Sequence, residues 1–251
     1  MIYPKHISSI VASVPTFVYK KRRLTRFFYW SPWILQHSIW PIVRPLFLLF
    51  IHLDIRGAEH LAALDPKSRG VIFAVSHSSE LDSILVPAAL PFLSPFLPMF
   101  YTSREWTFYK TSGWRRYFYG GLLFNFWGAH RLHSGKHSYE ISLETHIELL
   151  QNGKSLCMFP DGKRLPEEEV GAHAHGGVGF LAWRTGAAIV PVRITGIFHM
   201  SFSEFLTRKR TARVVFGKPL YSPDLFSNSA RPSLEDIKSA TAKIVLSIRV
   251  L

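Results

Sequence analysis

A short apolar run at residues 71–75 ends abruptly in a polar stretch that carries His77 and Asp82. The run is typical of a buried strand, and the spacing from Ser79 to Asp82 is typical of a helix start. Within one helix, five steps of about 100° would leave His77 and Asp82 about 140° apart, too far round to meet. We therefore predict a strand, a turn that holds His77, and a helix with Asp82 in its first turn.

Such a pair has a chemical use. A carboxylate that binds one imidazole nitrogen orients the ring and leaves the other nitrogen free to act as a general base, as in acyl transfer. A simpler interpretation is a histidine in a strand-to-helix turn and a carboxylate that favours the positive end of the helix. Both interpretations fit these residues, and His77 and Asp82 are the candidate catalytic pair.

Apolar, strand-like runs alternate with helical patterns along the rest of the chain. Strands are expected at residues 99–102, 155–159, 188–194 and 213–216, and helices up to about residue 90 and over residues 114–127, 142–150, 176–185 and 233–250. Pro191 indicates that its strand lies at an edge or at a strand end. The alternation predicts an α/β fold with a mixed, mostly parallel sheet flanked by helices, whose ligands gather at the carboxyl ends of the strands.

The N-terminal part of the chain is dense in aromatic and basic residues. Pro32, Pro41, Pro45 and Arg44 interrupt its apolar stretches, and a spanning helix needs about 20 predominantly apolar residues. We expect a broken pair of helices that lies in a membrane interface, with basic residues 20–26 on anionic lipid. The alternative is an amphipathic hairpin packed on the protein's own core.

These patterns divide the chain into a membrane-associating helical segment at residues 1–54 and an α/β domain at residues 55–251. The basic cluster at residues 20–23 follows the apolar residues 7–19, which is the wrong polarity for a signal peptide.

The charge of the chain limits its partners. Thirty Lys and Arg against 17 Asp and Glu give a net charge of +13, and 14% of the residues are aromatic. This composition suits an anionic membrane surface, nucleic acid or an acidic small substrate. The single cysteine, Cys157, excludes an intramolecular disulfide and a cysteine zinc cluster. A protein on the cytoplasmic side is the simplest interpretation.

A second motif, Phe-Pro-Asp-Gly-Lys-Arg at residues 159–164, follows another expected strand. Pro-Asp-Gly is a turn signal in its own right, but a turn does not explain Lys163 and Arg164. Cationic side chains beside the amides of a tight turn suit a phosphate. His173 and His175 lack the carboxylates of a metal shell, so we expect surface histidines and no metal. The sequence contains no G-x-S-x-G, P-loop or G-x-G-x-x-G motif, which argues against hydrolases and nucleotide-binding proteins.

The order of the motifs resembles the glycerolipid acyltransferase family, which includes 1-acyl-sn-glycerol-3-phosphate acyltransferases. That family carries N-H-x-S-x-x-D, a G-A-I-x-V-x-R-like block, F-P-E-G-T-R and a V-P-V strand. The similar segments here are residues 76–82, 128–134, 159–164 and 189–192. Four blocks in order are more specific than any one of them, and the resemblance runs from about Ile55 to Leu220.

The resemblance implies that His77 is the catalytic base and Asp82 its partner. It also implies a substrate-binding set that holds the phosphate of the acceptor, formed by Asp161, Gly162, Lys163, Arg164 and Arg131. The chain departs from the family pattern where Asp161 replaces Glu and Lys163 replaces Thr. Ser134 stands where the second block has its arginine, so Arg131 and Lys136 are both candidates for that role.

The resemblance further implies transfer of an acyl chain from an acyl thioester, acyl-CoA or acyl-carrier protein, to a lysophospholipid hydroxyl. The expected acceptor is 1-acyl-sn-glycerol-3-phosphate, and the expected role is membrane phospholipid biosynthesis or remodelling. The expected partners are the acceptor, the thioester and a membrane surface at its cytoplasmic face, without a further cofactor and without nucleic acid. The alternatives are another lysolipid acceptor, a His/Asp metal-dependent phosphoester hydrolase, and a non-catalytic basic lipid- or nucleic-acid-binding protein.

Overall fold

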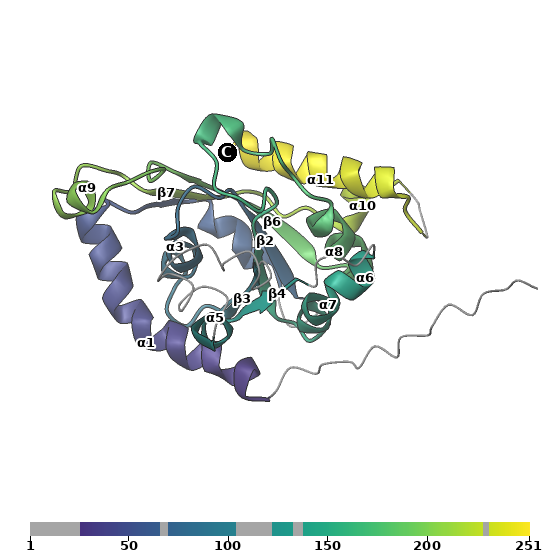
Figure 1. Ribbon diagram of the computed structural model, residues 1–251, viewed down its shortest axis with the longest axis horizontal. Coiled ribbons are helices and arrows are strands. Elements are labelled where there is room, and N and C mark those ends of the chain that lie inside the picture. The colour runs from purple at the N-terminus through teal and green to yellow at the C-terminus, as the bar shows by residue number, and fades with distance from the viewer. Residues whose placement is uncertain (1–25, 66–69, 104–121, 133–137, 228–230) are drawn as a thin grey trace, which may run out of the picture.

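The computed structural model describes residues 26–65, 70–103, 122–132, 138–227 and 231–251. In this part of the chain the strands form a seven-stranded sheet in the order β1-β7-β6-β2-β5-β3-β4, with helices on both faces (Figure 1). All described neighbours pair in parallel except β6 and β7, which pair antiparallel. The predicted α/β class with a mostly parallel sheet is confirmed.

The strands place several loops at one edge. Their bounds are β1 (Asp54–Arg56), β2 (Val71–Val75), β3 (Met99–Ser103), β4 (Ala129–Arg131), β5 (Ser155–Met158), β6 (Ala188–Thr195) and β7 (Arg213–Phe216). Because β2, β5, β3 and β4 are parallel, their carboxyl ends share one edge of the sheet. The turns that follow the neighbouring strands β2 and β5 therefore meet there.

Two helical layers bury the two faces of the sheet. The described helices are α1 (Arg26–Phe50), α3 (Asp82–Ala89), α5 (Leu122–Trp127), α6 (Tyr139–Ser142), α7 (Glu144–Gln151), α8 (Gly177–Thr185), α9 (Phe202–Leu206), α10 (Ser222–Leu225) and α11 (Leu234–Arg249), with 3₁₀ turns η1 (Ala58–Ala63) and η3 (Glu167–Glu169). Side chains alternate along β2, so Phe73 packs towards α1 and α3, whereas Ile72 packs towards α7, α8 and α11.

The prediction that Pro191 marks an edge or a strand end is wrong. β6 lies inside the sheet, between β2 and β7. The Pro191 carbonyl accepts a hydrogen bond from Gly217 N at 2.8 Å, so the nitrogen of Pro191 also faces the β7 side of the strand. Strand β7 ends at Phe216, one residue before this position. The missing N–H therefore falls beyond the end of the β6–β7 ladder, where proline costs little.

The prediction of a broken helix pair is also wrong, because α1 is one helix of 25 residues that runs through three prolines. The part of the predicted segment before Arg26, including the basic residues 20–23, lies outside the described residues, as do residues 114–121 of the helix expected at 114–127. Each interior proline costs about 3 kcal/mol. Contacts with the rest of the domain must offset that cost.

Polar side chains of α1 bind backbone groups of the α/β domain. Gln36 Nε2 donates to Met99 O at 2.7 Å and Trp127 O at 3.0 Å, and its Oε1 accepts from Met99 N at 2.9 Å. Arg44 donates to Ala88 O and Leu90 O, which satisfies carbonyls at the C-terminal end of α3. These bonds fix α1 against the start of β3, the end of α5 and the end of α3.

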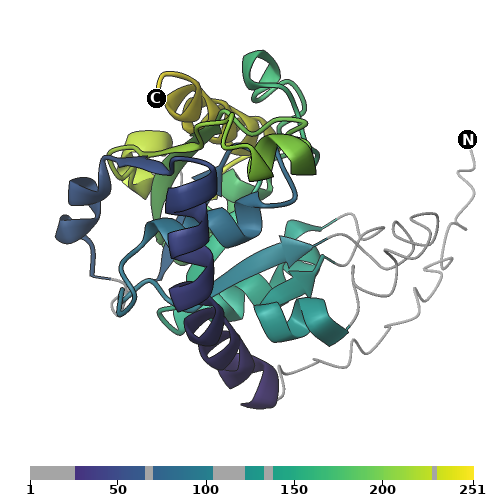
Figure 2. The ribbon, with the colours of Figure 1, turned by 90° about the vertical axis from the view of Figure 1, so that its left-hand side faces the viewer.

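The outer side of α1 remains apolar and exposed. Its exposed large apolar residues are Phe27, Trp30, Trp33, Ile34, Ile42, Leu46, Leu48 and Leu49. Figure 2 shows α1 along the face turned to the viewer. No helix in the described ranges is long and apolar enough to cross a membrane.

Replacing the buried Gln36 with Leu tests how firmly α1 is fixed. The change keeps the size of the side chain but leaves the Met99 amide and two carbonyls without their partner. Met99 is fully buried, so its orphaned N–H and C=O cost about 1–3 kcal/mol each, and the free energy of unfolding should fall by roughly 2–6 kcal/mol. Urea denaturation measures this, with Gln151→Leu at the exposed end of α7 as the matched control. Equal stability of the two variants would show that the Gln36 bonds do not hold α1.

Candidate active site

His77 and Asp82 meet at the carboxyl end of β2. His77 lies on the turn before α3, and Asp82 is the first residue of that helix. The distance from His77 Nδ1 to Asp82 Oδ2 is 2.9 Å. The Asp82 side chain is fully buried, whereas that of His77 is 22% exposed. Because Nδ1 faces the carboxylate, Nε2 is the ring nitrogen left for a substrate.

The buried Asp82 carboxylate is held by hydrogen bonds from the turn that precedes it. Its Oδ2 accepts hydrogen bonds from Ser78 N at 2.7 Å and Ser79 N at 2.9 Å, and its Oδ1 accepts one from Ser78 Oγ at 3.3 Å. A buried charge is costly unless it is hydrogen-bonded in this way. Asp82 therefore both shapes the turn and orients His77, a geometry compatible with both interpretations of the motif.

Phe159 fixes the plane of the imidazole, a contact that the sequence interpretation missed. The two rings stack with centroids 4.1 Å apart and an angle of 21°. The available signal was the position of Phe159 directly after a buried strand and before the Pro-Asp-Gly turn. With Nδ1 bound to Asp82 and one ring face on Phe159, the direction of Nε2 is set.

Cys157 lies beneath the site and is fully buried on β5. Burial, with a smaller contribution from the negative charge of Asp82, raises the pKa of the Cys157 thiol well above its usual value. The thiol is therefore neutral near neutral pH, and a neutral buried thiol is a poor nucleophile.

The turn after β5 packs against His77. Gly162 adopts the left-handed conformation with φ of 62°, which suits glycine, and its N–H donates to Phe159 O at 3.0 Å. Leu165 N donates to His77 O at 2.8 Å. These bonds bring Arg164 to the His77 turn, where its Nη1 lies 2.8 Å from Glu80 Oε1.

Asp161 has both carboxylate oxygens bound within the protein. It is 3% exposed and accepts hydrogen bonds from Gly171 N at 2.9 Å and His173 N at 3.1 Å. This placement differs from the predicted substrate contact, because the side chain turns into the protein to hold the segment at 171–173. We assign Asp161 a positioning role.

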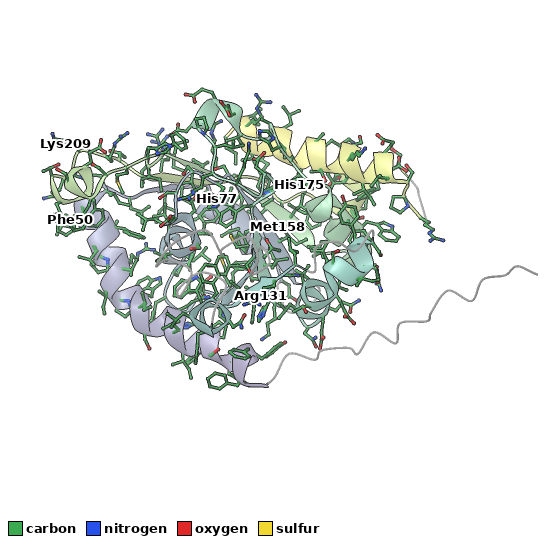
Figure 3. The ribbon with its side chains drawn as sticks, in the orientation of Figure 1. Phe50, His77, Arg131, Met158, His175 and Lys209 are labelled. Atoms are coloured by element: carbon green, nitrogen blue, oxygen red, sulfur yellow. The ribbon has the colours of Figure 1, made fainter. Side chains whose placement is uncertain are left out.

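The other predicted cations differ in where they lie relative to His77. Lys163 is exposed on the turn. Arg131 ends β4 and is exposed at the same edge, but three inter-strand steps, or about 14 Å, separate β4 from β2. Figure 3 shows Arg131 away from His77. Lys136 lies outside the described residues. Burial lowers the pKa of His130 to about 4, so Arg131 is the charged member of this pair at neutral pH.

His173 and His175 are both exposed. His175 is labelled in Figure 3, and its N–H donates to Pro160 O at 3.0 Å. Within the described ranges, no group of three His, Cys, Asp or Glu side chains could hold a metal ion.

Comparisons with known proteins bear on the family of the chain. A family model described as Acyltransferase matches residues 52–195. A chloroplastic 1-acyl-sn-glycerol-3-phosphate acyltransferase of Arabidopsis thaliana is 31% identical over 98 residues, 38% of this chain. The match spans only about a quarter of that relative's length, 27%.

A solved structure shares the fold. The 1-acyl-sn-glycerophosphate acyltransferase PlsC of Thermotoga maritima superposes with a TM-score of 0.56 at 19% sequence identity. The superposition covers 89% of this chain and 82% of that one. The family model alone covers more than half of the 251 residues and includes both motifs that form the site. The chain belongs to the acyltransferase family.

Proposed function

We propose that the protein transfers an acyl chain from an acyl thioester to the hydroxyl of a lysophospholipid at a membrane surface. The observation that carries the proposal is the His77–Asp82 pair, with Nε2 available and the Arg164 turn bonded directly to it. The names of the Arabidopsis relative and of the Thermotoga protein both specify 1-acylglycerol phosphate. We therefore propose 1-acyl-sn-glycerol-3-phosphate as the acceptor.

The mechanism follows from the orientation of His77, whose Nδ1 is bonded to Asp82 while Nε2 faces away from it. His77 Nε2 removes the proton of the acceptor hydroxyl as its oxygen attacks the thioester carbonyl. Asp82 stabilises the imidazolium that forms, since its carboxylate is already oriented by Ser78 and Ser79. When the tetrahedral intermediate collapses, the carbon–sulfur bond breaks and the imidazolium returns the proton to the thiolate.

His77→Ala should lower kcat by about 10²–10⁴ without unfolding the protein, because it removes the base. The measurement is thiol release from an acyl thioester in the presence of lysolipid, alongside a denaturation curve. His173→Ala, which removes an exposed imidazole, is the matched control and should keep near-normal turnover. Near-normal turnover by a folded His77→Ala protein would contradict the mechanism.

The Glu80 carboxylate competes with the acceptor phosphate for Arg164. Arg164 and Glu80 form an ion pair whose side chains are 49% and 38% exposed. Exposed pairs of this kind contribute about 0–1 kcal/mol, so a phosphate can displace the carboxylate. A phosphate can also take two parallel bonds from a guanidinium, which is a stronger interaction. We propose that Glu80 holds Arg164 until the acceptor arrives.

Arg164→Ala should reduce kcat/KM for lysophosphatidic acid by roughly 10- to 150-fold, the equivalent of about 1.5–3 kcal/mol for a charge-assisted contact. Use of a monoacylglycerol without phosphate should change little. Glu80→Gln should act in the opposite direction, with a gain of up to about fivefold for the phosphate acceptor. The measured quantity is the ratio of kcat/KM for the two acceptors.

Lys163→Ala, Arg131→Ala and Lys136→Ala are the comparison variants for the same ratio. If Arg164→Ala discriminates between the acceptors as the wild type does, the phosphate site lies elsewhere. A changed ratio in Arg131→Ala or Lys136→Ala would then identify it.

Asp161→Asn should behave differently from Arg164→Ala. It weakens two hydrogen bonds to the segment at 171–173, so the free energy of unfolding should fall by about 1.5–3 kcal/mol. The acceptor ratio should remain that of the wild type, because the carboxylate does not touch the acceptor. Glu169→Gln, which changes an exposed acid in the neighbouring turn η3, is the control for stability. A changed acceptor ratio at unchanged stability would instead support the predicted contact between Asp161 and the substrate.

Attachment to the membrane is assigned to α1. Its outer apolar residues, among them Trp30, Trp33 and Ile42, are exposed, and its inner side chains are bonded to the domain. An apolar helix face of this kind lies in the plane of the bilayer interface, with aromatic rings at headgroup depth. The net charge of +13 adds attraction to anionic lipid.

A further inference from the structure

The connection between β6 and β7 carries the short helix α9, which projects beside the C-terminal end of α1 (Figure 1). Phe202 is 75% exposed and Leu206 is 49% exposed. Residues four apart lie on the same side of a helix, so the two side chains form one apolar projection. Large apolar side chains that project together mark an interaction site.

The projection is held firmly. Ser201 and Glu204 form a capping box at the start of α9, and Arg210 binds Glu204 Oε1 at 2.8 Å. On the inner side, Phe205 stacks on Phe50 of α1, with centroids 5.1 Å apart. Packing of Phe205 therefore fixes the direction in which Phe202 and Leu206 point.

Cationic residues follow the projection directly. Arg208 and Lys209 are exposed, whereas the charge of Arg210 is used by Glu204. Figure 3 shows Lys209 and Phe50 at the same end of the molecule. Apolar side chains flanked by exposed cations complement an anionic bilayer, whose headgroups attract the charges and whose chains accept the apolar groups.

We propose that α9 is a second membrane contact. Phe202 and Leu206 enter the acyl-chain boundary, and Arg208 and Lys209 bind anionic headgroups. The inference rests on the proposed attachment of α1, because exposed Leu46 and Leu49 of that helix continue the apolar surface towards α9.

A second contact has a consequence for orientation. One helix lying on a bilayer lets the protein roll about the helix axis, whereas a contact beside that axis prevents rolling. Figure 2 shows α1 and α9 on the same face. Fixing both would hold the carboxyl edge of the sheet, with His77 and Arg164, at one angle to the membrane that supplies the acceptor.

The first experiment locates residue 202 relative to the bilayer. Phe202→Cys protein is labelled with an environment-sensitive fluorophore and mixed with vesicles of phosphatidylcholine and phosphatidylglycerol that contain nitroxide-labelled lipid. Buried Cys157 does not compete for the label, because burial raises its thiol pKa. The control is Leu246→Cys, a 60% exposed position on α11, across the sheet from α1. We expect a blue shift and lipid quenching at position 202 and neither at position 246.

The second experiment measures affinity. Phe202→Ser combined with Leu206→Ser should weaken vesicle binding by at least about tenfold, since it removes two large apolar groups from the contact. Lys209→Gln should weaken binding to anionic vesicles more than to neutral ones. The matched control, Leu246→Ser, should bind as the wild type does.

The outcomes separate the inference from the proposed function. If the protein sediments with vesicles while the label at position 202 stays in water, α1 attachment stands and the α9 contact is overturned. Equal quenching at positions 202 and 246, or unchanged binding of the Phe202/Leu206 variant, also overturns the contact. A shift at position 202 that appears without vesicles as protein concentration rises would assign α9 to a contact between copies. Protein that does not bind vesicles overturns both.

Discussion

The site depends on one buried carboxylate. Asp82 is fully excluded from water, and its charge is balanced by two turn amides, a serine hydroxyl and the His77 imidazole. A carboxylate in this position cannot move without leaving buried donors unsatisfied, so the turn, the start of α3 and the direction of the imidazole are fixed together. The geometry of the His77–Asp82 pair is thus inseparable from the local fold.

The parallel sheet extends that constraint to the rest of the site. β2 and β5 are neighbours, so the turns that follow them meet at the same edge, where the Leu165 amide binds the His77 carbonyl. Phe159 and Arg164 reach the His77 turn through this bond and the ring stack. Helix α1 is held in a different way. Side chains on its inner side are hydrogen-bonded to the domain, while its outer side stays apolar and exposed.

Local patterns predicted much of this arrangement. The apolar run before His77 became β2, and Asp82 lies in the first turn of α3, as predicted. The last helix was predicted to begin at residue 233, and Ser233 is its N-cap and forms a capping box with Asp236. Such features are set by neighbours in the chain, because strand periodicity and capping act over a few residues. The α/β class followed from their alternation, and the motif order indicated the family.

By itself, the sequence determined the elements, the polar motifs and which residues could carry charge or chemistry. The tertiary structure decided where partners distant in the chain would lie. Pro191 is tolerated inside the sheet because β7 ends beside it, and three prolines are tolerated in α1 because Gln36 and Arg44 bind backbone groups far along the chain. Asp161 turns inward because amides ten and twelve residues away reach it. Buried polar groups must find partners wherever the fold brings them, and no local pattern contains that information.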